Sequence, residues 1–204
     1  MQNKRKILIY GDSNTYGYDP ADMYERRYPL QLRWTTILQE RLQKDWVILP
    51  EGMNGRKLPD LRYDSRRIRN LMAGLTPDDI FAVMLGTNDI LLTMDPDAGS
   101  AVRSMESFLC FLLESREPET ILVIAPPHIG SSLIRDPLYR RYYEESLKMN
   151  EGFGLLSKKY KVRFADAGDW DIALSADLVH FSEEGHRQFA GKLEEFMRCY
   201  HLKE

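Results

Sequence analysis

The chain has 204 residues, which is enough to bury one sizeable hydrophobic core and does not by itself require a second domain. Its composition, 43% apolar and 29% charged with a net charge of −3, is that of an ordinary water-soluble globular protein. Acidic and basic residues are interspersed, with no long block of one sign. We therefore expect no binding to nucleic acid or to an anionic membrane.

The cysteines and the N-terminus bear on the cellular compartment. The two cysteines, Cys110 and Cys199, each fall in a predicted amphipathic helix, which favours buried, reduced thiols over a disulfide. The apolar run after the basic N-terminus is too short for the core of a signal peptide, and no run approaches the length of a membrane span. These features predict a cytoplasmic protein.

Five short apolar runs predict the strands of a sheet. They cover residues 6–10, 46–49, 80–85, 121–125 and 162–165. Three runs are almost continuously apolar, as in strands buried on both faces, whereas the last alternates and is expected at an edge.

Helical spacing of apolar residues separates these runs. It predicts helices over residues 34–42, 68–75, 102–113, 139–160 and 189–200, the last with Ser182 as a cap. Strands that alternate with helices imply crossover connections. The fold class is therefore α/β: a three-layer α/β/α domain around a mainly parallel five-stranded sheet.

Polar and glycine-rich residues follow each predicted strand, where ligands bind in parallel α/β sheets. In chain order they are 11–13 (Gly-Asp-Ser), 50–56 with two glycines, 86–89 (Gly-Thr-Asn-Asp), His128 after a Pro-Pro pair, and 177–180 (Asp-Leu-Val-His). Turn chemistry alone does not explain polar groups at so many strand ends. His128 is either a loop residue or part of this pocket.

Ser13 is the candidate nucleophile, and His180 is its candidate base. A serine hydroxyl reacts poorly until an imidazole removes its proton, and that imidazole needs an acceptor on its other nitrogen. Asp177 precedes His180 by three residues, so one turn of chain can bring its carboxylate beside the ring. Taken alone, Ser13 could instead be only the N-cap of a strand-to-helix turn. The G-x-S-x-G elbow of α/β-hydrolases is absent.

An oxyanion that forms at Ser13 would need hydrogen-bond donors. The backbone N–H groups of Ser13 and Gly55 and the side-chain amide of Asn88 would form this oxyanion hole if the three loops meet. Asn88 could otherwise be a simple turn residue. Tyr16 and Tyr18 come just after the nucleophile and are either walls of a substrate pocket or packing aromatics.

These motifs resemble those of the SGNH hydrolases, also called the GDSL esterase/lipase superfamily. The similar blocks are Gly11-Asp12-Ser13-Asn14, Gly55 with its flanks, Gly86-Thr87-Asn88-Asp89 and Asp177-x-x-His180. The flanking residues at 11–18, 33–34 and 51–56 are most similar to the bacterial arylesterase and acyltransferase subgroup. Leu178 stands where this family often has glycine, and Lys57-Leu58-Pro59 stands where relatives often carry threonines.

The resemblance implies a flavodoxin-like fold, a single catalytic domain over residues 1–204, and hydrolysis of a small-molecule acyl ester through an acyl-enzyme. It implies catalysis with no metal and no cofactor. Short acyl groups, often acetyl, are typical substrates. Several members of the subgroup also transfer the acyl group to alcohols, and several are homo-oligomers. The resemblance therefore also implies acyl transfer to alcohols and self-association for this chain.

Two other classes stay open from the residues alone. The loop at 11–17 could bind a phosphate or nucleotide without catalysis, as a flavodoxin-like binding module. A metallohydrolase could use Asp12, Asp89, His180 and His186, although no tight ligand motif such as His-Glu-x-x-His occurs. His186, in the first turn of the last helix, is expected to be partly exposed. Asp12 either braces its turn or takes part in the chemistry.

Overall fold

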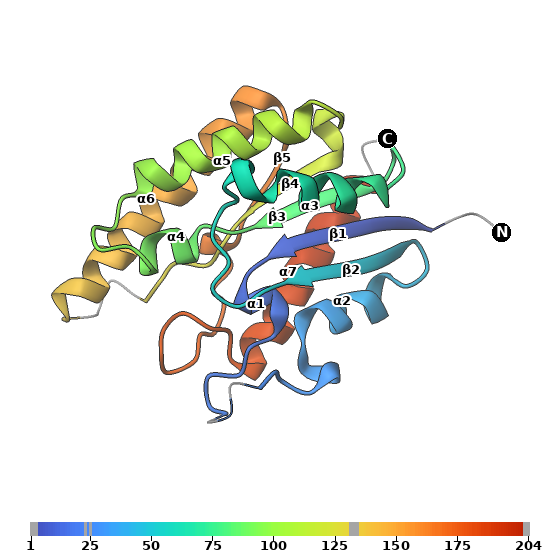
Figure 1. Cartoon of the computed structure of the whole chain (residues 1–204). Helices are drawn as coiled ribbons and strands as arrows, with labels where there is room; N and C mark the ends of the chain where they lie inside the picture. Colours follow the sequence, from blue (N-terminus) through green and yellow to red (C-terminus); the bar gives the residue numbers. More distant parts are fainter. Residues whose placement is uncertain (1–3, 23, 25, 131–134, 202–204) are drawn as a thin grey trace.

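A five-stranded parallel sheet forms the centre of the molecule (Figure 1). Its strands are β1 (Arg5–Gly11), β2 (Trp46–Gly52), β3 (Ile80–Met84), β4 (Ile121–Ala125) and β5 (Arg163–Asp166), in the order β2-β1-β3-β4-β5. This computed structural model describes residues 4–22, 24, 26–130 and 135–201. The predicted strands are all present, and β5 lies at an edge as its alternating pattern predicts.

Helices cover both faces of the sheet, which confirms the three-layer α/β/α fold (Figure 1). One face carries α2 (Trp34–Leu42) and α7 (Glu183–His201), and the other carries α3 (Leu61–Ala73), α5 (Ala98–Leu113) and α6 (Pro137–Tyr160). Two short helices, α1 (Ser13–Tyr16) and α4 (Thr87–Leu91), directly follow β1 and β3, and 3₁₀ turns occur at Leu30–Leu32, Pro118–Thr120 and Ala167–Asp169.

The inner strands send successive side chains into opposite cores. Leu8 and Tyr10 of β1 pack on the side of α3, α5 and α6, whereas Ile7 and Ile9 pack on the side of α2 and α7. This follows from the two-residue period of a strand, because both faces of the sheet are covered. It is also why the strands read as continuous apolar runs. The rigid double core fixes where the carboxyl ends of β1, β2 and β3 lie.

Most helices lie where the sequence patterns predict them, but α3 begins at Leu61, well before the predicted residue 68, and ends at Ala73 rather than 75. Ser182 caps α7 as predicted, since its Oγ accepts the N–H of Gly185 at 3.1 Å. Helix α6 continues through Gly152, where a Cβ would lie 2.4 Å from Val102 of α5. The small residue therefore lets α5 and α6 approach closely. The Gly-Thr-Asn-Asp motif does not form a simple turn, because residues 87–91 continue as α4.

Two predictions about burial are wrong. Cys110 and Cys199 are exposed, because they lie on the solvent-facing sides of α5 and α7, and neither forms a disulfide. His186 is fully buried rather than partly exposed, because the first turn of α7 packs against α2 and Tyr28. Among the helices that the structure describes, none has both the length and the apolar character needed to cross a bilayer.

Candidate active site

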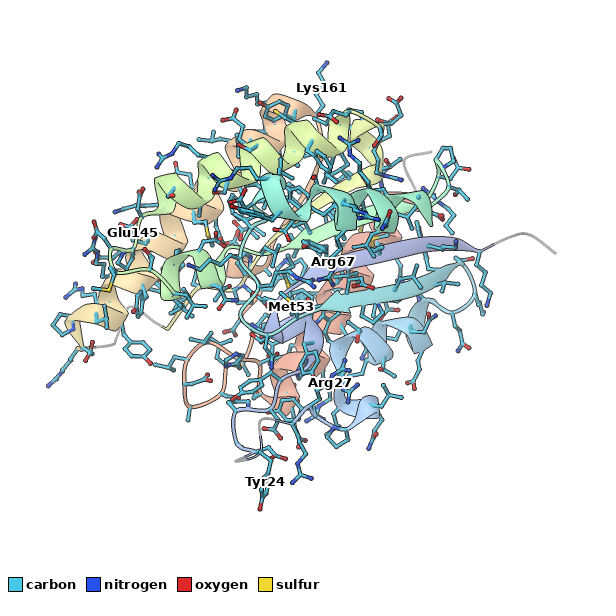
Figure 2. The ribbon with its side chains drawn as sticks, in the orientation of Figure 1. Tyr24, Arg27, Met53, Arg67, Glu145 and Lys161 are labelled. Carbon is cyan, nitrogen blue, oxygen red and sulfur yellow. The ribbon has the colours of Figure 1, made fainter. Side chains whose placement is uncertain are left out.

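The order of the strands brings the predicted site residues together at the carboxyl ends of the strands. Because β1 lies between β2 and β3, the segments that carry Gly55 and Asn88 flank the one that carries Ser13. The loop with Asp177 and His180 leaves β5, at the far edge, and reaches back to α1 (Figure 1). Figure 2 labels Met53, just past β2, and Arg27, from the segment after α1, at this same end of the sheet.

The turn after β1 holds Ser13 at the first position of α1. Asp12, not Ser13, is the N-cap, since its carboxylate accepts the N–H of Asn14 at 3.0 Å. The interpretation of Ser13 as only a cap is therefore wrong. Burial raises the pKa of Asp12 to about 6. At Gly52 a Cβ would lie 2.2 Å from the backbone nitrogen of Tyr16, so glycine allows β2 to press against α1.

Ser13, His180 and Asp177 are hydrogen-bonded in series. The Nε2 of His180 lies 3.0 Å from the Ser13 hydroxyl oxygen, and its Nδ1 lies 2.6 Å from an oxygen of Asp177. Burial would raise the pKa of Asp177, but hydrogen bonds from the His180 ring and backbone outweigh it and hold that pKa below its usual value. An ionised Asp177 places the ring proton on Nδ1, which leaves Nε2 as the acceptor for the serine hydroxyl.

The loop that carries Asp177 and His180 is internally bonded. One oxygen of Asp177 accepts the N–H groups of Val179 and His180, each at 3.0 Å. Leu178 has a φ of 61°, so it takes the left-handed conformation that glycine would adopt without strain. Its carbonyl accepts the N–H of Gly130 at 2.8 Å, which fixes this conformation from outside the loop. Leucine thus holds a positive φ at this position, even though glycine would adopt it without strain.

The three predicted oxyanion donors lie on adjacent segments. Ser13, as the first residue of α1, has an N–H group with no acceptor inside the helix. Gly55 has a φ of 68°, again in the left-handed region that favours glycine. Asn88 is 8% exposed, and its amide nitrogen donates one hydrogen bond to the carbonyl of Arg56 at 3.0 Å. The amide carries a second N–H that can face a ligand.

Arg56 connects the segments that carry these donors. Its side chain is only 3% exposed and lies over the ring of Tyr10, with the guanidinium carbon 4.2 Å from the ring centroid. Its Nη1 donates to the carbonyl of Gly11 at 2.8 Å and also to the carbonyl of Glu51. The sequence patterns assign no role to Arg56, although it lies within the motif at residues 51–56. One buried cation thereby connects β1, β2 and, through its own carbonyl, α4.

Tyr16 and Tyr18, which follow the candidate nucleophile Ser13, have different surroundings. The ring of Tyr18 lies against His180, with 4.6 Å between ring centroids. Tyr16 instead lies under the guanidinium of Arg27, 4.1 Å from the ring centroid, and its carbonyl accepts a hydrogen bond from the same side chain. Tyr18 therefore contacts the site directly, whereas the ring of Tyr16 packs against Arg27.

The remaining candidates lie outside the series of bonded residues. Asp89 accepts the N–H of Leu58 at 3.0 Å, and burial raises its pKa to about 6. His128 packs edge-on against Tyr143, and burial lowers its pKa. His186 accepts the N–H of Trp34 through Nδ1 and is enclosed by aromatic rings. No group of three or more His, Cys, Asp or Glu side chains in the described ranges could hold a metal ion.

A serine hydroxyl, an imidazole and a carboxylate in series, at the carboxyl edge of a parallel α/β sheet, form the arrangement found in serine hydrolases. The model of the GDSL-like lipase/acylhydrolase family matches residues 9–188, and the chain belongs to this family. It is therefore a hydrolase that acts on esters, as the motifs predict. A comparison with curated proteins finds no match.

Solved structures with the same fold cover nearly the whole chain. A carbohydrate acetylesterase from Sinorhizobium meliloti is 26% identical, with a TM-score of 0.80 over 97% of this chain and 100% of the other. A proposed arylesterase from Agrobacterium tumefaciens is 27% identical, with a TM-score of 0.79 over 96% and 99%. The aryl esterase of M. smegmatis, at 24% identity, has the same fold, with a TM-score of 0.80 over 96% and 99%.

Proposed function

We propose that this protein is a serine esterase that hydrolyses short-chain acyl esters, acetyl esters first among them, through an acyl-enzyme. The observation that carries the proposal is the 3.0 Å contact between Ser13 Oγ and His180 Nε2, with Asp177 2.6 Å from the other ring nitrogen. A general base must lie within hydrogen-bond reach of the proton that it removes, and this pair does.

In the proposed mechanism, Ser13 Oγ attacks the ester carbonyl while His180 Nε2 takes the hydroxyl proton. Asp177 orients the ring and stabilises the imidazolium. Collapse of the tetrahedral intermediate breaks the bond to the alcohol oxygen, which receives the proton from His180. Water, deprotonated by the same nitrogen, then attacks the acyl-enzyme. Collapse of this second tetrahedral intermediate breaks the ester bond to Ser13 Oγ, which regains the proton from His180, and releases the carboxylic acid. Asp12 takes no part, because it is engaged as the cap of α1.

Negative charge on the carbonyl oxygen would be held by the N–H groups of Ser13 and Gly55 and by the Asn88 amide. Donors fixed before the reaction stabilise this charge without reorganisation, which makes them a large contribution to the rate. The hydrogen bonds of Arg56 and Asp89 to neighbouring segments support such fixed placement.

The substrate class rests on similarity. The Sinorhizobium meliloti structure is of a carbohydrate acetylesterase, and we extend acetyl esters, acetylated sugars included, to this chain as its expected substrates. Tyr18 beside His180 would line the pocket. An alcohol in place of water would receive the acyl group by the same route, so acyl transfer is an expected side reaction. Self-association and a cytoplasmic location stay predictions from the sequence.

The test is hydrolysis of 4-nitrophenyl acetate by the wild type and by Ser13→Ala, His180→Ala and Asp177→Asn. We expect losses in kcat of about 10⁴ to 10⁶ for the first two variants. Ser107→Ala is the matched control, since Ser107 lies on the exposed side of α5. A fluorophosphonate probe should label the wild type at Ser13 and leave Ser13→Ala unlabelled. Equal activity in all proteins, or a nucleotide retained by an inactive protein, would refute the proposal.

The acyl group is tested separately. A series of 4-nitrophenyl esters of increasing acyl length should show the highest kcat/KM for acetate, and acetylated sugars should release acetate. Mass spectrometry during turnover should find one acetyl group on the peptide that contains Ser13. Preference for long acyl chains would contradict the substrate class but leave the esterase mechanism intact.

A further inference from the structure

Asn14, the residue after the candidate nucleophile, is bonded to the chain on both sides of His180. Its amide nitrogen donates to the carbonyl of Val179 at 3.2 Å, and its amide oxygen accepts the N–H of Phe181 at 2.9 Å. A carboxamide is one of the few side chains that offers a donor and an acceptor side by side. The side chain of Asn14 therefore pairs with the residues that flank His180, as a neighbouring strand would.

Asn14 is itself held firmly. It is 5% exposed, its N–H is bonded to Asp12, and its carbonyl accepts the indole N–H of Trp34 at 2.9 Å. Trp34 is fully buried in the core between α2 and the sheet. These bonds hold the backbone of Asn14 in place beside Ser13, the residue that precedes it in the chain.

The other hydrogen bonds that the structure describes for Asp177 and Leu178 do not reach α1. Those of Asp177 lie within the loop, and that of Leu178 leads to Gly130. Within the part of the chain that the structure describes, residues 175–181 are joined to α1 by the two bonds of Asn14 and by the Ser13–His180 contact itself. The Asn14 bonds are therefore the ones that can align that contact before a substrate arrives.

We infer that Asn14 is a positioning residue, which sets the alignment of His180 Nε2 with Ser13 Oγ through the backbone of Val179 and Phe181. The inference rests on the proposed function, since it assigns a role in that reaction. A misplacement of about 1 Å between reacting groups can lower a rate by about 10²-fold. Removal of the Asn14 amide should therefore lower the rate of the chemical step without removing any group of the triad.

The experiment compares Asn14→Leu, which keeps the approximate size but loses both bonds, with Thr15→Val as a matched control. Thr15 is the next residue of α1, is 1% exposed, and has a hydroxyl with no hydrogen-bond partner in the described part of the chain. For 4-nitrophenyl acetate, Asn14→Leu should lower kcat by about 10²-fold with little change in KM. Thr15→Val should keep the wild-type values. Thermal unfolding shows that each variant is folded at the assay temperature.

A double-mutant cycle separates positioning from general damage. If Asn14 acts through His180, then Asn14→Leu should have little further effect on the residual rate of His180→Ala, because the two losses are not additive. If Asn14→Leu lowers kcat by the same factor in the wild type and in His180→Ala, or lowers kcat in neither, the inference would be overturned.

A second measurement does not depend on activity. The amide hydrogen of Phe181 is bonded to the side chain of Asn14 and should exchange slowly in the wild type and in Thr15→Val, but much faster in Asn14→Leu. Unchanged exchange would overturn the inference even if activity fell. A wild type that hydrolyses no ester would refute the proposed function, while the exchange result would still decide whether Asn14 holds this loop.

Discussion

His186 should make the protein lose stability as the pH falls below neutrality. Burial, with a smaller contribution from the charge of Arg33, lowers the pKa of His186 from an ordinary value of 6.5 to about 4. Well above pH 6.5 the ring is neutral in the folded and unfolded chains, so it has no effect on the pH dependence of stability there. Between these two pKa values the unfolded chain binds a proton that the folded chain does not, and this favours unfolding. The folded and unfolded pKa values differ by about 2.5, and one pKa unit corresponds to about 1.4 kcal/mol. The free energy of unfolding therefore falls by about 3 kcal/mol, a loss that is complete below about pH 4.

The assay is urea unfolding of the wild type, His186→Asn and His186→Phe at steps from about pH 8 to about pH 4. Asparagine can still accept the N–H of Trp34, and phenylalanine keeps the ring, but neither titrates. Both variants are expected to be less stable than the wild type near pH 8. Because Asp12 has a pKa raised to about 6, its contribution has the opposite sign, but it is common to all three proteins. The stability advantage of the wild type should therefore shrink by about 3 kcal/mol on acidification. An advantage that stays constant with pH would refute the reasoning.

Three further results are expected. Asn88→Ala should lower kcat for 4-nitrophenyl acetate by about 10²- to 10³-fold, as for other lost oxyanion donors, and an unchanged kcat would exclude Asn88 from that role. Leu178→Val should destabilise the protein by about 1 kcal/mol or more in denaturant unfolding, because a β-branched residue is disfavoured at positive φ, whereas Leu178→Gly should stay within about 1 kcal/mol of the wild type; the reverse order would contradict the strain argument. A thiol reagent should modify both Cys110 and Cys199 in the folded protein, since both are exposed. If either thiol reacts only after unfolding, its exposure in the structure would be contradicted.

The sheet and its helices were predictable because their signals are local. Strands buried on both faces are apolar throughout, and helices repeat apolar residues at helical spacing, so both patterns can be read without knowing what they pack against. The position of the site followed from a general rule, that polar groups after parallel strands meet at one edge. Ser13, Gly55 and Asn88 could be placed together for this reason.

Features that depend on a distant partner were not predictable in the same way. His186 is polar and lies in a first turn, which suggests exposure, yet Trp34 and Tyr28 enclose it from a segment some 150 residues earlier in the chain. The two bonds of Asn14 reach across a similar span of sequence to the loop around His180. The exposure of the cysteines depends on which side of each helix faces the core. A shift of one residue along the helix would move a cysteine from the solvent-facing side toward the core. The motif pointed to Asn14, but only the contacts indicate what it does.

The separation of Ser13 from His180 along the chain has a consequence for biosynthesis. The two residues that touch are 167 positions apart, with the proposed nucleophile just after the first strand and its proposed base just before α7. Bringing the ends of so long a segment together carries a large entropic cost, which only the completed sheet and cores can offset. If Ser13 and His180 act as proposed, a chain emerging from the ribosome displays Ser13 early but without its base, and Ser13 gains reactivity when the loop that carries His180 docks. Labelling of Ser13 by a fluorophosphonate would thus report the final stage of folding rather than the appearance of secondary structure.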